Sequence, residues 1–148
     1  DANNVCRSLA RGLLKCGGRL RVAAPKGFQL QPDFIASLGA GEALQQMEDP
    51  REAVREAEVV YTDVWTSMGQ EREAAARAKI FRKYQLNRRL LAGAPKALVM
   101  HCLPAHRGME ITDEAIDSPA SVVYDQAENR LHTQQALLFS LLGPRSRK

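Results

Sequence analysis

The sequence predicts a doubly wound α/β fold, a mainly parallel sheet flanked by helices. Two observations support this prediction. Segments of strand type alternate with segments of helical type along the chain. The strand segments are also continuous apolar runs, such as "EVVYTDVW" and "KALVM", rather than alternating polar and apolar residues. Continuous apolar strands are typical of parallel sheets that helices cover on both faces.

The first half of the chain alternates helices with strands. Apolar residues recur at helical spacing over residues 5–16, where a Gly-Gly pair ends the pattern. "RLRVAAP", residues 19–25, predicts a strand that stops at its proline. A second helix is expected over residues 32–44. Another is expected over residues 49–58, because its first residues, Asp-Pro, suit the cap and first helical position.

The second half continues this alternation. Its expected elements are a strand at 59–65, helices at 70–84 and 87–91, a strand at 97–100, a short helix at 112–118, a strand at 121–125 and a closing helix at 127–143. The closing helix carries several leucines on one side, at Leu131, Leu138, Leu141 and Leu142.

Length and composition exclude several classes of protein. The 148 residues are enough for one domain with a real core. Nucleic-acid binding is disfavoured because aromatic residues are 5% of the chain and the net charge of +4 owes much to a basic tail at 143–148. No apolar run approaches the roughly 18 residues of a membrane helix, so we expect no membrane contact. Three cysteines without a CxxC pair suit a reducing, cytoplasmic location.

Chemically active side chains follow three of the predicted strands. Asp63 lies near the end of one strand, Cys102 directly follows another, and Arg130 follows the strand expected at 121–125. Ligands of doubly wound sheets bind beyond the carboxyl ends of the strands, so we expect these three groups to converge at one edge. A carboxylate, a thiol and a guanidinium together suit a small zwitterion. Arg130, expected near a helix start, opposes the helix dipole there, which favours a bound anion.

Each of these residues also has a plain alternative role. Asp63 could cap a helix near the "SMG" segment, and Asn3 or Asn4 is more often a helix cap than a ligand contact. Cys102 alone would usually be a small buried apolar residue. His101 should point to the opposite face of the strand from Cys102, so it is not expected to act as a base for the thiol. No zinc spacing and no GxGxxG loop is present, so we expect no metal and no cofactor.

Taken together, five motifs resemble the second half of ornithine carbamoyltransferases. They are "DANNV", "PKGF", "TDVWTSMGQE", "MHCLPAHRG" and "AENRLH", and the resemblance extends over residues 1–142. "SMG" with "HCLP" separates the ornithine enzymes from the aspartate branch, and "LPAHRG" looks like bacterial members. The resemblance implies the Rossmann-like fold of the aspartate and ornithine carbamoyltransferases. It also implies transfer of the carbamoyl group of carbamoyl phosphate to the δ-amine of L-ornithine, giving L-citrulline and phosphate.

The resemblance assigns four residues to L-ornithine. Asn4 would hold its carboxylate, and Asp63 would bind its α-ammonium group. Ser67 and Met68 would complete this pocket from the loop after the strand.

The resemblance also places the reacting groups. Cys102 and Leu103 would lie where the δ-amine meets the carbamoyl carbon, and Arg130 would bind carbamoyl phosphate. Cys102, Asp63 and Arg130 are therefore the expected catalytic residues. A thiolate titrating near ~pH 8, with its pKa lowered further by nearby cations, could handle the proton that the amine must lose. Proximity of the two substrates could supply much of the acceleration.

Two motifs of the family's first half, Ser-x-Arg-Thr and His-Pro-x-Gln, do not occur here. We therefore expect an ornithine-binding domain at 1–142 that works with an N-terminal domain of its own protein, in a homotrimer, and has little turnover alone. Three alternatives remain open. The chain could be a non-catalytic ligand-binding relative, a cysteine hydrolase built on Cys102, or a transcarbamylase for another amine such as putrescine. Retention of Asp63 and "SMG" argues against the last, because putrescine lacks the amino-acid head group.

Overall fold

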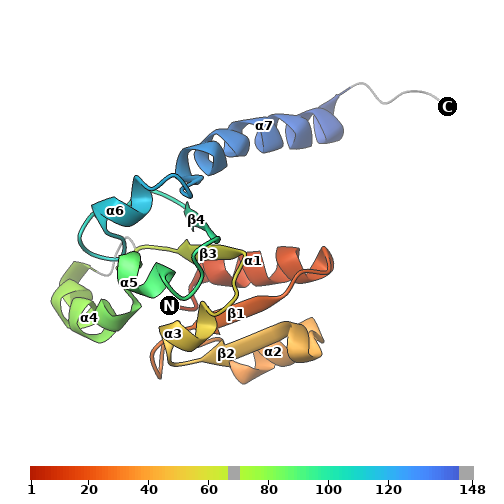
Figure 1. Ribbon diagram of the computed structural model, residues 1–148. Helices are drawn as coiled ribbons and strands as arrows, with labels where there is room; N and C mark the ends of the chain where they lie inside the picture. The colour runs from red at the N-terminus through yellow and green to blue at the C-terminus, as the bar shows by residue number, and fades with distance from the viewer. Residues whose placement is uncertain (67–70, 144–148) are drawn as a thin grey trace.

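The chain forms the expected doubly wound α/β fold, with parallel strands at the centre and helices around them (Figure 1). The computed structural model describes residues 1–66 and 71–143. The strands of that part are β1 (Leu20–Ala23), β2 (Leu44–Met47), β3 (Val59–Thr62) and β4 (Leu98–His101). β1 pairs with β2 and β3 pairs with β4, both in parallel. The carboxyl ends of paired strands therefore lie side by side.

The segment that follows β1 differs from the sequence-based expectation. α1 (Asn4–Lys15) forms as predicted, but α2 (Pro32–Leu38) stops well before residue 44. Gly39 ends α2 because it adopts the left-handed conformation at φ 57°, which glycine reaches without steric cost. A 3-10 turn at Gly41–Ala43 then leads into β2, which the sequence did not predict. "LQQM" becomes a strand through its pairing with β1, a tertiary contact that local periodicity does not reveal.

The other helices of the body are short. α3 (Pro50–Ala53) begins as predicted, with Asp49 Oδ1 accepting from the Arg51 N–H at 2.9 Å, but it has four residues. The helix expected at 70–84 is divided into 3-10 turns at both ends and a central α-helix. The remaining elements are 3-10 turns at Glu71–Glu73 and Arg82–Tyr84, α4 (Ala74–Phe81), α5 (Arg88–Leu91) and α6 (Asp113–Ile116).

The strand predicted at residues 121–125 is wrong. Ser121 makes a single parallel bridge to Val99 of β4, and the chain then enters α7 (Val123–Leu142). α7 thus begins four residues before the expected start of the closing helix, and it extends away from the body of the molecule (Figure 1). The leucines of this helix are exposed. Leu131, Leu138, Leu141 and Leu142 are all at least 56% exposed.

The core lies under the strands in three clusters. The largest surrounds the β3–β4 pair and includes Val60, Val99 and, from the start of α7, Val123. A second cluster lies around β1 and β2. A third, aromatic cluster brings Trp65 and Phe81 together, so it supports the chain directly after β3. Among the described residues, no helix combines the length and the apolar character needed to cross a bilayer.

Candidate functional site

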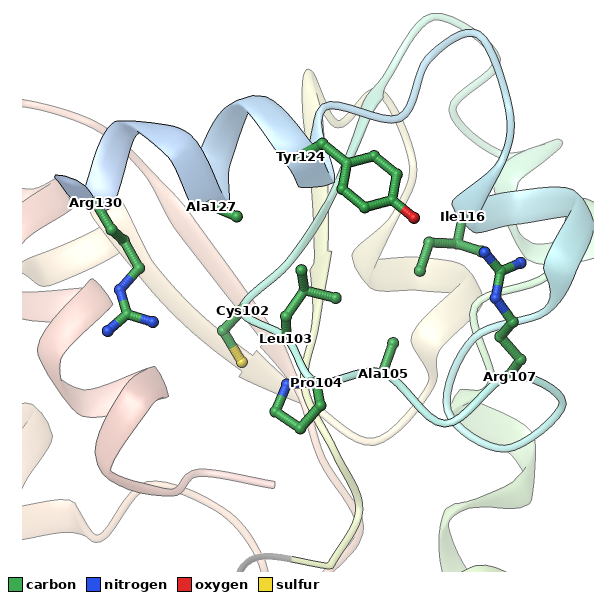
Figure 2. A pocket seen from close by; sticks show the side chains of 9 residues that line it. All are labelled: Cys102, Leu103, Pro104, Ala105, Arg107, Ile116, Tyr124, Ala127 and Arg130. Carbon is green, nitrogen blue, oxygen red and sulfur yellow. The ribbon is translucent and has the colours of Figure 1, made fainter. Parts of the chain in front are cut away.

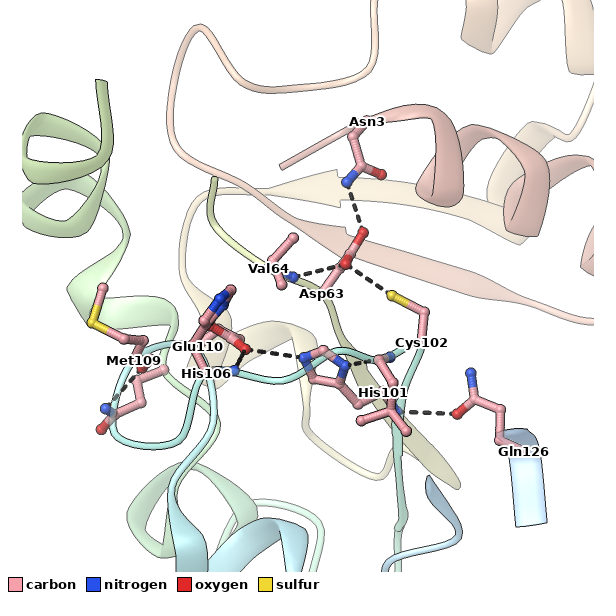
Figure 3. Close-up of polar contacts among 11 residues, drawn as sticks. Asn3, Asp63, Val64, His101, Cys102, His106, Met109, Glu110 and Gln126 are labelled. Carbon is pink, nitrogen blue, oxygen red and sulfur yellow. Dashed lines mark hydrogen bonds and ion pairs between the residues drawn. The ribbon is translucent and has the colours of Figure 1, made fainter. Parts of the chain in front are cut away.

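The candidate site lies where β3 and β4 end. The register pairs Thr62 with His101, the last residues of the two strands. Asp63 directly follows β3 and Cys102 directly follows β4. The thiol of Cys102 donates to Asp63 Oδ1 at 2.8 Å (Figure 3). The sequence-based expectation that this carboxylate and this thiol converge at one edge is confirmed by the geometry.

Both oxygens of the Asp63 carboxylate are engaged. Oδ2 accepts from the side-chain amide of Asn3 at 2.7 Å, and Oδ1 also accepts from the Val64 N–H at 2.7 Å. Asn3 is the cap of α1, because its Oδ1 accepts from the N–H groups of Val5 and Cys6. One asparagine thus joins the start of a 12-residue helix to the carboxylate at the strand edge. The positive end of the α1 dipole favours an anion at this place.

The thiol of Cys102 is held in its protonated form. Burial and the hydrogen bond and negative charge of Asp63 raise the pKa of Cys102 to about 11. A thiol is then the dominant form at neutral pH, and it acts as a hydrogen-bond donor to the carboxylate. The expectation of a thiolate with a pKa lowered by nearby cations is therefore wrong. The thiol is partly buried and its charged neighbour is the anion Asp63, and both effects disfavour the thiolate.

His101 belongs to a separate, fully buried cluster behind the strand end. Its Nδ1 accepts from the Leu103 N–H at 2.9 Å, so the ring proton is on Nε2, which lies 3.2 Å from Glu110 Oε1 (Figure 3). Glu110 Oε1 also accepts from the His106 N–H at 2.5 Å. Burial alone would raise the pKa of Glu110, but these hydrogen bonds lower it below its ordinary value. His101 thus orients the backbone at Leu103 and does not serve Cys102 as a base, as the sequence suggested.

Sequence reasoning missed Glu110. It lies nine residues after His101 and is 0% exposed. The signal that could have found it is its place between two apolar residues, in "MEI", where an exposed acid is not expected. A buried carboxylate needs hydrogen-bond partners, so this pattern marks Glu110 as a candidate, although it does not say which residue is the partner.

A cavity of about 580 Å³ opens beside Cys102 (Figure 2). Its lining consists of Cys102, Leu103, Pro104, Ala105, Arg107, Ile116, Tyr124, Ala127 and Arg130. Cys102, Leu103 and Arg130 therefore share one space, as the sequence predicted for the thiol and the guanidinium.

Two arginines line this cavity, in different electrostatic settings. Arg107 pairs with Asp113 at 2.7 Å and with Asp117 at 2.5 Å, so its charge is balanced by carboxylates at the two ends of α6. Arg130 enters from α7, as the eighth residue of that helix. Arg130 does not lie at a helix start, where the sequence predicted it, because α7 begins two turns earlier, so its cation does not oppose the helix dipole there. The case for an anion at Arg130 now rests on the shared cavity.

The remaining predicted site residues are placed differently or lie outside the described part. Asn4 is the first residue of α1 and is exposed, whereas its neighbour Asn3 makes the contact with Asp63. Ser67 and Met68 fall outside the described residues. Within residues 1–66 and 71–143, no group of three or more His, Cys, Asp or Glu side chains is arranged to hold a metal ion.

Comparisons with known proteins point to one family. Residues 1–141 match the family described as "Aspartate/ornithine carbamoyltransferase, Asp/Orn binding domain". The chain is 55% identical over 143 residues to the anabolic ornithine carbamoyltransferase of Pseudomonas aeruginosa, covering 96% of this chain and 46% of that protein. It is 48% identical to the ornithine carbamoyltransferase of Archaeoglobus fulgidus, covering 99% of this chain and 48% of the relative.

Solved structures give the same result. Ornithine carbamoyltransferase from Pyrococcus furiosus superposes with a TM-score of 0.85 at 49% identity, covering 94% of this chain and 46% of the other. The enzyme from Gloeobacter violaceus also gives a TM-score of 0.85, at 46% identity, covering 97% of this chain and 49% of the other. The chain thus spans about half the length of the relatives it matches.

Proposed function

This chain belongs to the aspartate/ornithine carbamoyltransferase family, whose Asp/Orn-binding domain it matches, and we propose that it binds L-ornithine for an ornithine carbamoyltransferase. In that reaction the δ-amine of ornithine attacks the carbamoyl carbon of carbamoyl phosphate. A C–N bond forms, the C–O bond to the phosphate breaks, and the amine loses a proton. The products are L-citrulline and phosphate. The observation that carries the proposal is the Asp63–Cys102 contact of 2.8 Å at the strand edge, beside the cavity that Arg130 also lines.

Asp63 is proposed to bind the α-ammonium group of ornithine. Its carboxylate already accepts from Asn3, Val64 and Cys102, so its position is fixed before the ligand arrives. A preorganised anion loses little freedom on binding a cation. Asn4 is proposed to hold the ornithine carboxylate from the start of α1, and Ser67 and Met68 to complete the pocket.

Cys102, Leu103 and Arg130 are proposed to position the reacting groups. Arg130 supplies a cation for carbamoyl phosphate, and Cys102 and Leu103 lie at the turn where the amine would meet the carbamoyl carbon. Cys102, with a pKa raised to about 11, is a poor proton acceptor at neutral pH. Its role is therefore to hold Asp63 and the amine, and the departing phosphate is the better base for the amine's proton. Proximity then accounts for a large share of the rate.

The active enzyme is proposed to include more than this chain. Its relatives are about twice as long, so we propose an N-terminal domain of the same protein as the partner that completes the carbamoyl phosphate site, within a cytoplasmic homotrimer. By itself the 148-residue chain is expected to form little citrulline.

Calorimetry with the 148-residue chain tests the ornithine site. L-ornithine should bind, and putrescine, which lacks the carboxylate and α-amino group, should not. Asp63→Asn should weaken ornithine binding about 30- to 150-fold, because a hydrogen bond between charged groups contributes about 2–3 kcal/mol. Asp33→Asn is the matched control, since it makes the same change at an exposed position in α2 and should leave the affinity unchanged.

Two results would contradict the proposal. Equal affinity for putrescine and L-ornithine would favour a transcarbamylase for a simple diamine. Unchanged ornithine binding in Asp63→Asn would remove Asp63 from the site.

A further inference from the structure

The ladder on the outer edge of β4 ends at an unusual place. The Val99 N–H donates to the carbonyl of Ala120 at 2.9 Å, and the Val122 N–H donates to the carbonyl of Val99 at 3.0 Å. In an evenly spaced parallel ladder, the next bond would run from the His101 N–H to the carbonyl of Val122. That bond is replaced, because α7 begins here.

Gln126 satisfies both groups of the missing bond, the N–H of His101 and the carbonyl of Val122. Its backbone N–H donates to the carbonyl of Val122 at 2.8 Å, and this bond closes the first turn of α7. Its side-chain Oε1 accepts from the His101 N–H at 3.1 Å (Figure 3). Its Nε2 also reaches the hydroxyl of Tyr61, on β3, at 3.4 Å. One residue therefore ends the sheet and continues the helix through its backbone and side chain, and its side chain connects that helix to two strands.

The place where α7 leaves the sheet decides where Arg130 lies. Arg130 is four residues after Gln126, so the two side chains lie on the same side of the helix, one turn apart. Cys102 directly follows His101, the residue whose N–H Gln126 binds. The Gln126–His101 bond thus connects the helix that carries Arg130 to the end of the strand that leads into Cys102, and both residues line one cavity (Figure 2).

We propose that Gln126 is a positioning residue that holds the guanidinium of Arg130 beside Cys102. The value of this arrangement for carbamoyl phosphate rests on the function proposed above. The geometry itself can be tested without either substrate, so failure of one proposal is distinguishable from failure of the other.

The test uses Cys102 as a reporter of the charge of Arg130. Iodoacetate is an anion and iodoacetamide is neutral. The rate of Cys102 alkylation by iodoacetate, divided by the rate with iodoacetamide, therefore rises when a cation is near the thiol. The rates are measured on the Cys102 peptide by mass spectrometry, because Cys6 and Cys16 are also free thiols. Arg130→Met should lower the ratio about threefold, because it removes one charge from the shared cavity, where solvent keeps the dielectric high.

Gln126→Met is the informative variant, since it keeps a long side chain and removes both hydrogen bonds. It should lower the ratio by a similar factor in the wild-type background and should have no further effect together with Arg130→Met. Gln134→Met, at an exposed position of the same helix, is the matched control and should leave the ratio unchanged. Exchange of the His101 amide proton, followed by NMR, should become at least tenfold faster in Gln126→Met. In Gln126→Glu, which keeps the accepting oxygen, it should remain slow.

Two outcomes would overturn the proposal. One is faster exchange at His101 with an unchanged alkylation ratio. The other is an equal fall of the ratio whether or not Arg130 is present, which would indicate a general loosening of the strand end. Should Gln126→Met fail to fold, Gln126→Asn keeps the amide but is too short to reach His101, and it is held to the same criteria.

Discussion

His101 and Cys102 are adjacent in the chain, yet their side chains enter two polar clusters of opposite character. His101 joins Glu110 in a cluster that solvent does not reach, where both residues are at most 1% exposed. Cys102 joins Asp63 and Asn3 in a half-buried cluster beside an open cavity. The alternation of side chains along a strand separates the two. One residue therefore fixes the backbone of the site, while its neighbour faces the space for a ligand.

The largest expected effect concerns the buried cluster. Glu110→Ala should lower the free energy of unfolding by about 3 kcal/mol, because it leaves the buried Nε2–H of His101 and the partly buried N–H of His106 without their acceptor. Urea unfolding at pH 7 measures this loss. Glu42→Ala, at an exposed position in the turn before β2, should change stability by less than about 0.5 kcal/mol.

The same cluster predicts a dependence on acid. Since the pKa of Glu110 is lowered on folding, its stabilising effect is complete above the unfolded pKa of about 4.3 and is lost as the pH falls through the folded pKa. The stability difference between wild type and Glu110→Gln should therefore shrink below about pH 4. A difference that stays constant down to pH 3 would show that Glu110 is not bound as an anion.

The second effect concerns the half-buried cluster of Cys102, Asp63 and Asn3, and it is a change of about tenfold in the alkylation rate of Cys102. Burial, and then Asp63, raise the pKa of Cys102, so wild-type alkylation by iodoacetamide should increase with pH up to about 11. Asp63→Asn removes the negative charge but not the burial. It should lower the pKa of the thiol by about one unit and speed alkylation about tenfold at pH 8. A rate unchanged by Asp63→Asn would show that burial alone controls the thiol and that the two side chains are not coupled.

The positions of side chains that follow from strand ends could be predicted from the sequence. Asp63 and Cys102 each follow an apolar run, and parallel strands bring such residues together, so their convergence could be predicted. The separate face of His101 followed from strand alternation. Glu110 could not be found this way, because its partnership with His101 depends on a turn whose path no local pattern shows.

The fold shows the same division. β2 was missed because two of its four residues are glutamines, and the segment becomes a strand through pairing with β1. The strand expected at residues 121–125 has the right composition, but Gln126 occupies the next position of the ladder and helix formation begins. In both cases a tertiary hydrogen bond outweighs local propensity.

The smallest effects come from a second pair of neighbours, Asn3 and Asn4, which repeats the contrast at the start of α1. Asn3→Ala removes the helix cap and the donor to Asp63, and should lower the free energy of unfolding by about 1 kcal/mol. Asn4→Ala changes an exposed side chain and should cost less than about 0.5 kcal/mol, while it weakens L-ornithine binding if Asn4 holds the ornithine carboxylate. Urea unfolding and calorimetry on the two variants separate these effects. A larger stability loss in Asn4→Ala than in Asn3→Ala would reverse the assignment. If Asn4→Ala binds L-ornithine as tightly as the wild type does, Asn4 is not a ligand contact. The contacts would then lie at the strand edge formed by Asp63 and Cys102.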